Sequence, residues 1–443
     1  MPAYIVVRLS FKGAAILSKD LPIWLMEPET TEKRELAAKK LLGAGYNMAL
    51  VLKVASVEEL KRQIKEIRQY TRDNINLLVE ELKTTLSNKY PEVKTKWAVD
   101  NTDAVAYINS ISAGESTIST NNSSIVNKEL TPMLMALGFT VVNSYNHQFD
   151  IKERQFTDYW DLPRLSDRGL IGTFDIVAKM AGLPDTASRK YLAVLGVNAI
   201  SAEDGTTFFL EHFSNIHKDL EQANKVVLIV GLDKIVKTRE AAAFQAQCMG
   251  IFGMESVLLG IELKRSESPT IDKMLLPSGN GKRELHVIIL DNGRTELLQG
   301  KFRDLFLCIG CRACNNHCPI RHSFTNINYI WTPKNYLDEF LYGTCSSIDI
   351  CLHCEACRME CPLDIELSYL MWQAKLDHIA RHGTSFRHKI LGRPELLARL
   401  GTVLAPIANW MMGQQLVRIP MEMLTGIDRR TNLPKFHTRT FRK

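Results

Sequence analysis

The sequence lacks the patterns of several common functional classes. No G-x-G-x-x-G run follows a strand-like segment, so nothing in the chain indicates a bound dinucleotide. The segment Ser278–Arg283 places a lysine among glycines but lacks the G-x-x-x-x-G-K-[ST] spacing of a phosphate-binding loop, and we interpret it as a linker. No apolar, positively charged leader with a cleavage site precedes Lys12, so we expect a cytoplasmic protein without disulfides.

Cysteine is scarce, with ten among 443 residues, yet eight of the ten form two copies of one motif. The first copy runs from Cys308 to Pro319 as CIGCRACNNHCP, and the second from Cys351 to Pro362 as CLHCEACRMECP. Each copy has the spacing C-x2-C-x2-C-x3-C-P, which is that of bacterial-type ferredoxins with two 4Fe-4S clusters. The sequence therefore predicts a protein that transfers electrons.

The spacing also predicts which cysteines share a cluster. Three thiolates two residues apart wrap one cluster, while the fourth, next to the proline, points away and completes the neighbouring cluster. The predicted ligands are Cys308, Cys311, Cys314 and Cys361 for cluster one, and Cys351, Cys354, Cys357 and Cys318 for cluster two. Zinc is the alternative, but paired C-x2-C elements leave the third cysteine and the repeated C-P unexplained.

Two histidines and two further cysteines are not predicted to bind a metal. His317 and His353 lie inside the motifs, where we expect them to shape hydrogen bonding around the clusters rather than to bind iron. Cys248 and Cys345 lie outside the motifs, and a lone cysteine is most often a small buried apolar side chain. For Cys345, a role beside the second motif is the alternative.

The rest of the chain is long enough for more than a ferredoxin. With 443 residues, 45% of them hydrophobic, it can hold two or three domains. Short β-branched runs alternate with helical stretches before the motifs, which predicts a largely parallel sheet covered by helices. The expected strands lie at 139–142, 226–230, 256–259 and 286–290.

Helix and loop signals fill the segments between these strands. Ser56–Glu59 is a capping box that opens an amphipathic helix, which we expect to run to about Leu86. A second helix is expected from Asp103. The segments 148–168 and 266–283 have no clear period and are predicted to be surface loops.

The segment Glu203–Thr206 has two interpretations. In the first it is a small anion-binding turn, with the hydroxyls of Thr206 and Thr207 directed at a carboxylate or phosphate. In the second it closes a pair of strands, its acidic side chains lie in water, and Gly205 supplies a positive φ. We favour the second, because aspartate and glycine are ordinary turn residues.

The formal net charge of +6 is concentrated at the carboxyl end, where Leu376–Lys443 has twelve Lys or Arg and four Asp or Glu. Within this tail, Leu400–Val417 carries no charge, but its polar residues make it a poor transmembrane helix. The sequence leaves three roles open for this segment: docking on a partner subunit, covering the chain's own domains, or peripheral contact with the inner face of an anionic membrane.

Several segments resemble LUD-domain proteins. Leu195–Thr206, an apolar strand followed by G-x-x-x-A and an acidic-Gly-Thr turn, looks like the signature of that family. Val230–Val236 and Ser123–Leu130 are similar to its neighbouring elements, and Leu285–Arg294 leads directly into the first motif. From about Lys96 onward, this order of parts resembles the iron-sulfur subunit of lactate-utilisation complexes, the LutB type.

The resemblance implies a fold class and a division of the chain. The fold would be an α/β LUD domain, like the CoA-transferase and methenyltetrahydrofolate-synthetase group, followed by an α-helical ferredoxin-like domain with two [4Fe-4S] clusters. We therefore expect an N-terminal extension with an amphipathic helix at 1–95, the LUD domain at 96–300, the ferredoxin domain at 301–375 and a basic tail at 376–443.

The resemblance also implies a function. The chain would be a non-catalytic electron-transfer subunit of a multi-subunit oxidoreductase that oxidises L-lactate or another 2-hydroxy acid through a partner. Expected partners are cysteine-rich or flavin-containing redox subunits, with no nucleic acid. Because both motifs are complete, a heterodisulfide-reductase-like complex is an alternative. In a further alternative the LUD domain itself acts on a small acid or acyl thioester, although the sequence shows no convincing nucleophile and base.

Overall fold

The computed structural model describes residues 21–27, 57–143, 191–210, 216, 219–220, 223–253, 264–265, 284–315, 317–320, 332–342, 350–384 and 386–439. The chain divides into two compact units, Met1–Leu370 and Met371–Lys443. The expected strand at 256–259, the expected loops at 148–168 and 266–283, and Cys345 lie outside the described residues. The domain boundaries expected near residues 95, 300 and 375 stay predictions.

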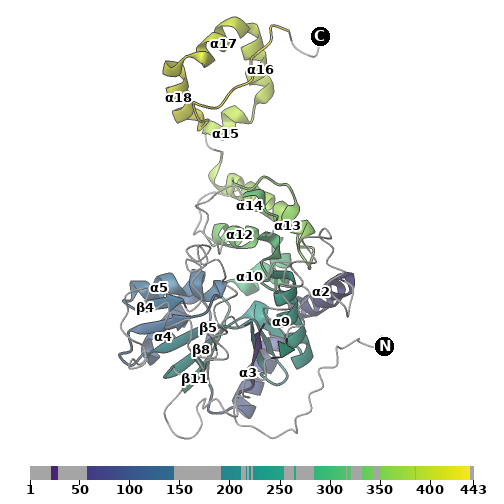
Figure 1. Ribbon diagram of the computed structural model, residues 1–443, viewed down its shortest axis with the longest axis vertical. Helices are drawn as coiled ribbons and strands as arrows, with labels where there is room; N and C mark the ends of the chain where they lie inside the picture. The colour runs from purple at the N-terminus through teal and green to yellow at the C-terminus, as the bar shows by residue number, and fades with distance from the viewer. Residues whose placement is uncertain are drawn as a thin grey trace, which may run out of the picture. The chain divides into compact units, whose positions relative to one another are not determined.

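A six-stranded sheet, in which every neighbouring pair is parallel, forms the centre of the first unit (Figure 1). The predicted parallel α/β architecture is thereby confirmed, as are the strands expected at 139–142, 226–230 and 286–290. The strand order is β2 (Lys94–Ala98), β11 (Glu284–Leu290), β8 (Lys225–Gly231), β5 (Leu192–Gly196), β3 (Thr117–Thr120) and β4 (Thr140–Asn143).

Both faces of this sheet are buried, so its central strands are apolar throughout. In β8, Val226 and Leu228 belong to one core, while Val227 and Ile229 belong to the other, because successive side chains point to opposite faces. The first core is covered by α3 and the second by α4 and α5 (Figure 1). These covering helices are α3 (Ile75–Lys89), α4 (Asn101–Ile111) and α5 (Thr131–Ala136), the last of which continues a π-helix, η2 (Ile125–Leu130).

A second, mixed sheet of five short strands lies in the same unit. Its order is β10 (Lys264–Arg265), β1 (Ile23–Glu27), β7 (Thr207–Leu210), β6 (Ala199–Ser201) and β9 (Ile235–Val236). Helices α2 (Val57–Asp73) and α9 (Arg239–Gly253) contact this sheet and each other, and α3 contacts it at β9. Helix α2 uses an apolar stripe in which Leu60 and Ile64 are buried, as predicted.

The single long helix expected to run to about Leu86 is wrong. The structure has two helices, α2 and α3, which are separated at Asn74. The side chain of Asn74 donates to the carbonyl of Tyr70 at 2.9 Å, and its backbone has left the helical region at φ −125° and ψ 19°. Asparagine interrupts helices in this way because its side chain competes for backbone hydrogen bonds.

The turn at Glu203–Thr206 closes the antiparallel pair β6–β7, and Gly205 has a φ of +76°, so the favoured interpretation is confirmed. The expectation that both of its acidic side chains lie in water is wrong for Asp204. Its carboxylate accepts a hydrogen bond at 2.6 Å from Nε of Arg239 at the start of α9, and its side chain is only 15% exposed. The turn is therefore fixed to α9 by an ion pair.

Several short helices and one long one, α14 (Leu367–His382), surround the two cysteine motifs at the end of the first unit. The short helices are α10 (Arg294–Leu298), η7 (Arg303–Leu307), η8 (Ala313–Asn315), α12 (Pro333–Leu341) and α13 (Ala356–Met359), and α14 extends into the second unit. Short helices between cysteine loops agree with the α-helical ferredoxin-like part expected from the sequence.

The second unit consists mainly of helices. After α14 they are α15 (Phe386–Leu391), α16 (Pro394–Val403), α17 (Ala405–Gly413) and α18 (Gln415–Thr425). The chain after α18 is fixed by Arg418, which donates to the carbonyl of Arg429, and by two hydrogen bonds of 2.8 and 2.9 Å between Asn409 and the backbone of Phe436.

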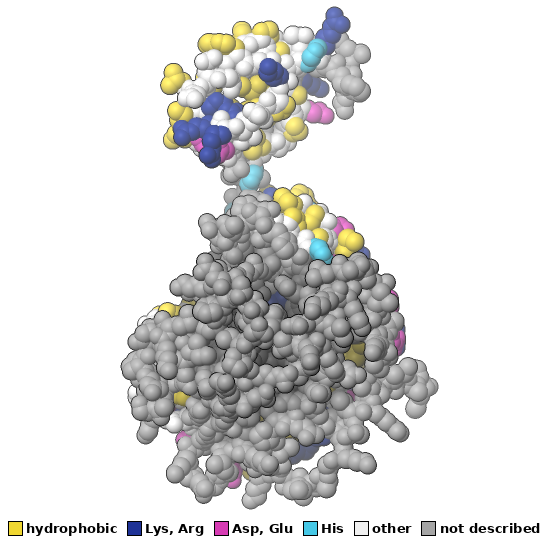
Figure 2. Space-filling model, viewed as in Figure 1, with side chains coloured by type: hydrophobic (Ala, Val, Ile, Leu, Met, Phe, Trp, Pro, Cys, Tyr) yellow, Lys and Arg dark blue, Asp and Glu magenta, His cyan; other side chains and the backbone are white. Residues whose placement is uncertain are grey.

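Apolar side chains remain exposed on this helical unit, beside arginines (Figure 2). The most exposed are Val403, Leu416 and Met423, at 80%, 85% and 82%. Among the helices of the described residues, none is both long and apolar enough to cross a bilayer.

Candidate metal centre

The two cysteine loops make the same backbone contact at the same motif position. In the first loop the N–H of Gly310 donates to Sγ of Cys308 at 3.3 Å. In the second loop the N–H of His353 donates to Sγ of Cys351 at 3.4 Å. A backbone donor two residues after the first cysteine therefore stabilises negative charge on that sulfur in both loops.

The loops also share an uncommon sequence of backbone conformations. The third and fifth motif positions are left-handed in both, with φ of 84° at Gly310 and 68° at Arg312, and of 52° at His353 and 63° at Glu355. Three of these four residues are not glycine, so the conformation has a cost that the surrounding structure must offset. A helical turn follows at the sixth position in each case, η8 in the first loop and α13 in the second.

Further backbone N–H groups favour the thiolate form of four other cysteines. Those of Ala313 and Lys334 act to lower the pKa values of Cys311 and Cys314. In the second motif Ile365 and Leu363 act in this way on the pKa of Cys361, and Arg358 on that of Cys357. Such donors are used around iron-sulfur clusters to stabilise thiolate charge and to adjust reduction potentials.

The thiols influence one another in two groups, which include members of both motifs. Burial raises the pKa of Cys361 to about 11, and the charge of Cys308 in the other motif adds to the effect. Burial also raises the pKa of Cys311, with contributions from Cys308 and Cys361. Without iron these thiols hold their protons at neutral pH, so metal binding has to displace them.

The second group is formed in the same crossed manner. Burial raises the pKa of Cys357 to about 12, and Cys351, Cys318 and Cys354 raise it further. Cys318 comes from the first motif, whereas the other three belong to the second. The crossed assignment of these cysteines to two clusters stays a prediction.

The surroundings of the two loops differ. Nζ of Lys234, which follows β8, donates to the carbonyl of Ile309 at 3.0 Å, and Arg312 donates to the carbonyl of Asn122 at 3.0 Å. These contacts place the first loop against the carboxyl edge of the parallel sheet, where open α/β folds commonly hold their ligands. In the second loop Cys354 is exposed, and Leu352 and Met359 are 65% and 79% exposed.

A largely buried network of ion pairs lies next to the first loop. Arg294, which follows β11, donates to Asp233 at 2.9 Å and to Glu129 at 2.7 Å. Burial alone would raise the pKa of Asp233, but the charges of Lys234 and Arg294, together with that of Lys334, hold it far below its usual range. The network joins the segments that follow β8 and β11 to η2, at the edge of the sheet that contacts the first loop.

Sequence reasoning missed the cations around the first loop. Arg68 of α2 donates to the carbonyls of Phe306 and Leu307, and Lys334 of α12 is near enough to Cys308 for the two charges to interact. One signal was present in the sequence, because Arg68 continues the buried stripe of Leu60 and Ile64 at intervals of four residues. A cation in that position of an apolar helix face calls for a buried partner.

The two motif histidines lie beside the cysteines. Nδ1 of His317 contacts Oε1 of Glu360 at 2.8 Å, which links the first motif to the second. Nδ1 of His353 lies 3.2 Å from the carbonyl of Ser368, so this ring also has a protein partner. The remaining described cysteine, Cys248 of α9, is completely buried, as expected for a packing residue.

The donor set fits an iron-sulfur cluster. All eight motif positions supply a thiol, and soft thiolates are the ligands that select iron-sulfur clusters and zinc. In the part of the chain that the structure describes, no three or more His, Cys, Asp or Glu side chains are arranged to hold a single metal ion.

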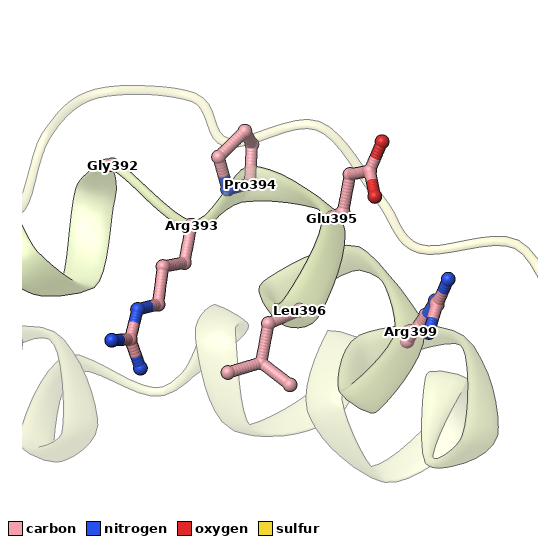
Figure 3. A pocket seen from close by; sticks show the side chains of 6 residues that line it. All are labelled: Gly392, Arg393, Pro394, Glu395, Leu396 and Arg399. Atoms are coloured by element: carbon pink, nitrogen blue, oxygen red, sulfur yellow. The ribbon is translucent and has the colours of Figure 1, made fainter.

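A shallow pocket lies in the helical unit, away from the cysteines in sequence. It is lined by Gly392, Arg393, Pro394, Glu395, Leu396 and Arg399, at the junction of α15 and α16. Figure 3 shows that the side chains of Arg393 and Glu395 point in different directions, so they do not converge on a ligand.

The comparisons with known proteins agree with the cysteine motifs. Residues 304–365 match the family of 4Fe-4S dicluster domains. Lactate utilization protein B of Bacillus cytotoxicus is 25% identical over 139 residues, which are 30% of this chain and 27% of that protein. Lactate utilization protein B 1 of Bacillus mycoides is 26% identical over 133 residues, which are 30% of this chain and 26% of that protein. No solved structure matches.

These similarities confirm the predicted resemblance to iron-sulfur proteins of the lactate utilization protein B type. They also show that the cysteine loops belong to a 4Fe-4S domain. The chain spans about a quarter of the length of the curated relatives it matches.

Proposed function

We propose that this chain is the iron-sulfur electron-transfer subunit of a multi-subunit oxidoreductase and that it holds two [4Fe-4S] clusters. The observation that carries the proposal is the repeated backbone of the two cysteine loops, with the same N–H to sulfur bond and the same left-handed positions. Two loops built alike, each with four thiols, are suited to two cofactors of one kind.

Within this proposal the ligation is crossed. Cys308, Cys311, Cys314 and Cys361 hold one cluster, and Cys351, Cys354, Cys357 and Cys318 hold the other. The mutual effects of the thiols on their pKa values support these two groups. Bound in these loops, the clusters would supply one-electron transfer, and the crossed ligands would keep them close together.

The substrate belongs to the proposal as well. The matched relatives are named for lactate utilization, so L-lactate or another 2-hydroxy acid, oxidised on a partner subunit, is the substrate class we propose. In this division of labour a flavin-containing or cysteine-rich partner performs the chemistry. The parallel α/β part, which we assign to a LUD domain, forms the surface on which the first cysteine loop is fixed.

Paired cysteine variants test the crossed ligation. After anaerobic reconstitution and reduction, Cys318→Ser and Cys354→Ser should lose the same paramagnetic resonance signal, because they remove ligands of one cluster. Cys361→Ser and Cys311→Ser should lose the other signal. Cys248→Ser, which changes a buried thiol outside the motifs, should keep both. The ligation is not crossed if Cys318→Ser behaves like Cys311→Ser.

A further inference from the structure

Arg68 carries a positive charge in the interior of the first unit, where charged side chains are rare. Its side chain is 0% exposed, at the point where α2 crosses η7 just before the first cysteine loop. Nε donates to the carbonyl of Leu307 at 3.1 Å, and a terminal nitrogen donates to the carbonyl of Phe306 at 2.6 Å. The other terminal nitrogen donates to Oε1 of Gln245 on α9 at 3.1 Å.

All three acceptors are neutral. Among the described residues no carboxylate lies within ion-pair distance of Arg68, although the neighbouring Arg72 on the same helix pairs with Asp73 and Asp304. Burial lowers the pKa of Arg68 to about 10, so the guanidinium still carries its charge at neutral pH. Arg68 is therefore a fully buried cation that contacts no carboxylate among the residues that the structure describes.

An unpaired buried charge is costly, and folded proteins rarely retain one without a counter-charge. The residue next to the Arg68 acceptors is Cys308, the first cysteine of the motif. The charges of Asp233 and of the Cys308 thiolate are the ones that act favourably on Arg68. A cluster with four thiolate ligands is negatively charged and gains one further negative charge on reduction.

We propose that Arg68 is the buried counter-charge of the first cluster, which positions the loop through two carbonyls and raises the reduction potential of that cluster. This inference rests on the proposed function, because it requires a cluster in the first loop. A cation close to the cluster favours the reduced form over the oxidised form, since the reduced form carries the greater negative charge. Arg68 acts through charge and loop position, not as a ligand.

The most informative variant keeps Arg68 in place. Gln245→Glu puts a carboxylate of nearly the same shape beside the guanidinium and offsets its charge. The bonds of Arg68 to Phe306 and Leu307 remain, and the bond from Nε2 of Gln245 to the carbonyl of Asn198 is lost. Redox titration followed by paramagnetic resonance should show that the reduced-to-oxidised ratio of the first cluster falls about tenfold at a fixed potential. That change is about 59 mV for one electron. The second cluster should keep its potential.

Two substitutions of Arg68 separate the effect of its charge on the potential from the effect of its shape and hydrogen bonds. Arg68→Gln should lower the potential of the first cluster in the same direction as Gln245→Glu. Arg68→Lys retains the charge and should leave the potential near that of the wild type, while its single donor group holds the loop less well. Arg62→Gln is the control, because it makes the same change of charge on the same helix with a side chain that is 56% exposed.

The outcomes distinguish this proposal from the function on which it rests. If the wild type binds two clusters but Gln245→Glu and Arg68→Gln leave the first potential unchanged, the role of Arg68 is wrong and the proposed function stands. If the wild type binds no cluster in the first loop, both are wrong. Should Arg68→Gln fail to fold, Gln245→Glu alone decides the question.

Discussion

The first and second cysteine loops have the same internal structure and different surroundings. Each has a backbone N–H bonded to its first sulfur and left-handed residues at its third and fifth positions. The first loop is held by Lys234 and Arg312 against the parallel sheet, whereas Cys354 of the second loop is exposed. The motif therefore determines how a loop presents its thiols, and residues remote in sequence determine the charge and solvent around it.

The largest difference between the loops should appear when their supporting ion pairs are broken. Arg294→Met removes the cation shared by the largely buried carboxylates Glu129 and Asp233, and loss of one member of a buried pair costs about 3–5 kcal/mol, which Lys234 beside Asp233 should reduce. Arg358→Met, within the second motif, breaks exposed pairs with Asp364 and Glu366 and should cost at most about 1 kcal/mol. Urea unfolding, monitored by circular dichroism, measures both losses of unfolding free energy. Equal losses would show that the two loops are supported alike.

Exchanging the third residue of each loop should also have unequal effects. Gly310→His introduces a side chain at φ 84°, where an added Cβ would lie 3.3 Å from Nζ of Lys234. The strain of about 1–3 kcal/mol and the displaced lysine should lower the amount of iron bound in the first loop. His353→Gly relieves strain at φ 52° and should leave the second cluster in place. Iron content per chain, with resonance spectra to identify the lost cluster, gives the comparison.

Because the second loop is more exposed, its cluster should release iron before the cluster of the first loop does. Cys354 is exposed and Met359 is 79% exposed, whereas Cys314 in the first loop is buried. During incubation with a strong chelator, release should therefore occur in two phases, and the signal lost by Cys354→Ser should fade in the faster phase. A single phase, or earlier loss of the signal that depends on Cys311, would contradict the difference in access.

The smallest effect on either loop should come from removing the second unit's last four helices. Both motifs precede Gly383, which ends α14 with a φ of +73°. A chain that stops at Gly383 should keep both clusters and their potentials while losing the exposed apolar side chains of α16–α18. We expect this shortened chain to separate from its redox partners during purification. Loss of clusters on shortening would show that the helices cover the loops instead.

The parts of the fold that sequence predicts well are those determined by local pattern. The runs at 226–230 and 286–290 are apolar and β-branched, and the structure has β8 and β11 there. Strand β3 was not expected, because Thr117–Thr120 lies in a polar run, yet all four of its residues are buried. Its polar groups find partners inside the protein; Ser119, for example, donates to Asp219 at 2.7 Å. Asp219 is remote from β3 in the sequence, so no local pattern around residues 117–120 reveals it.

The candidate site likewise has one part that follows from local sequence pattern and another that depends on the tertiary fold. The two motifs of four cysteines follow from spacing within two short segments, and residues 304–365, which contain both, match a 4Fe-4S dicluster domain. The cations beside the first loop come from residues 68, 234 and 334, which are widely separated in sequence. Only the tertiary fold brings them together, so the cysteine spacing could be recognised in the sequence, whereas the cations around the first loop could not.

The amount of iron and acid-labile sulfide bound per chain tests the central claim most directly. Protein prepared without oxygen and reconstituted to saturation should contain about eight irons and about eight sulfides, as expected for two 4Fe-4S clusters. Zinc in place of iron, or a saturated content of about four irons, would contradict the assignment of one cluster to each set of crossed thiols.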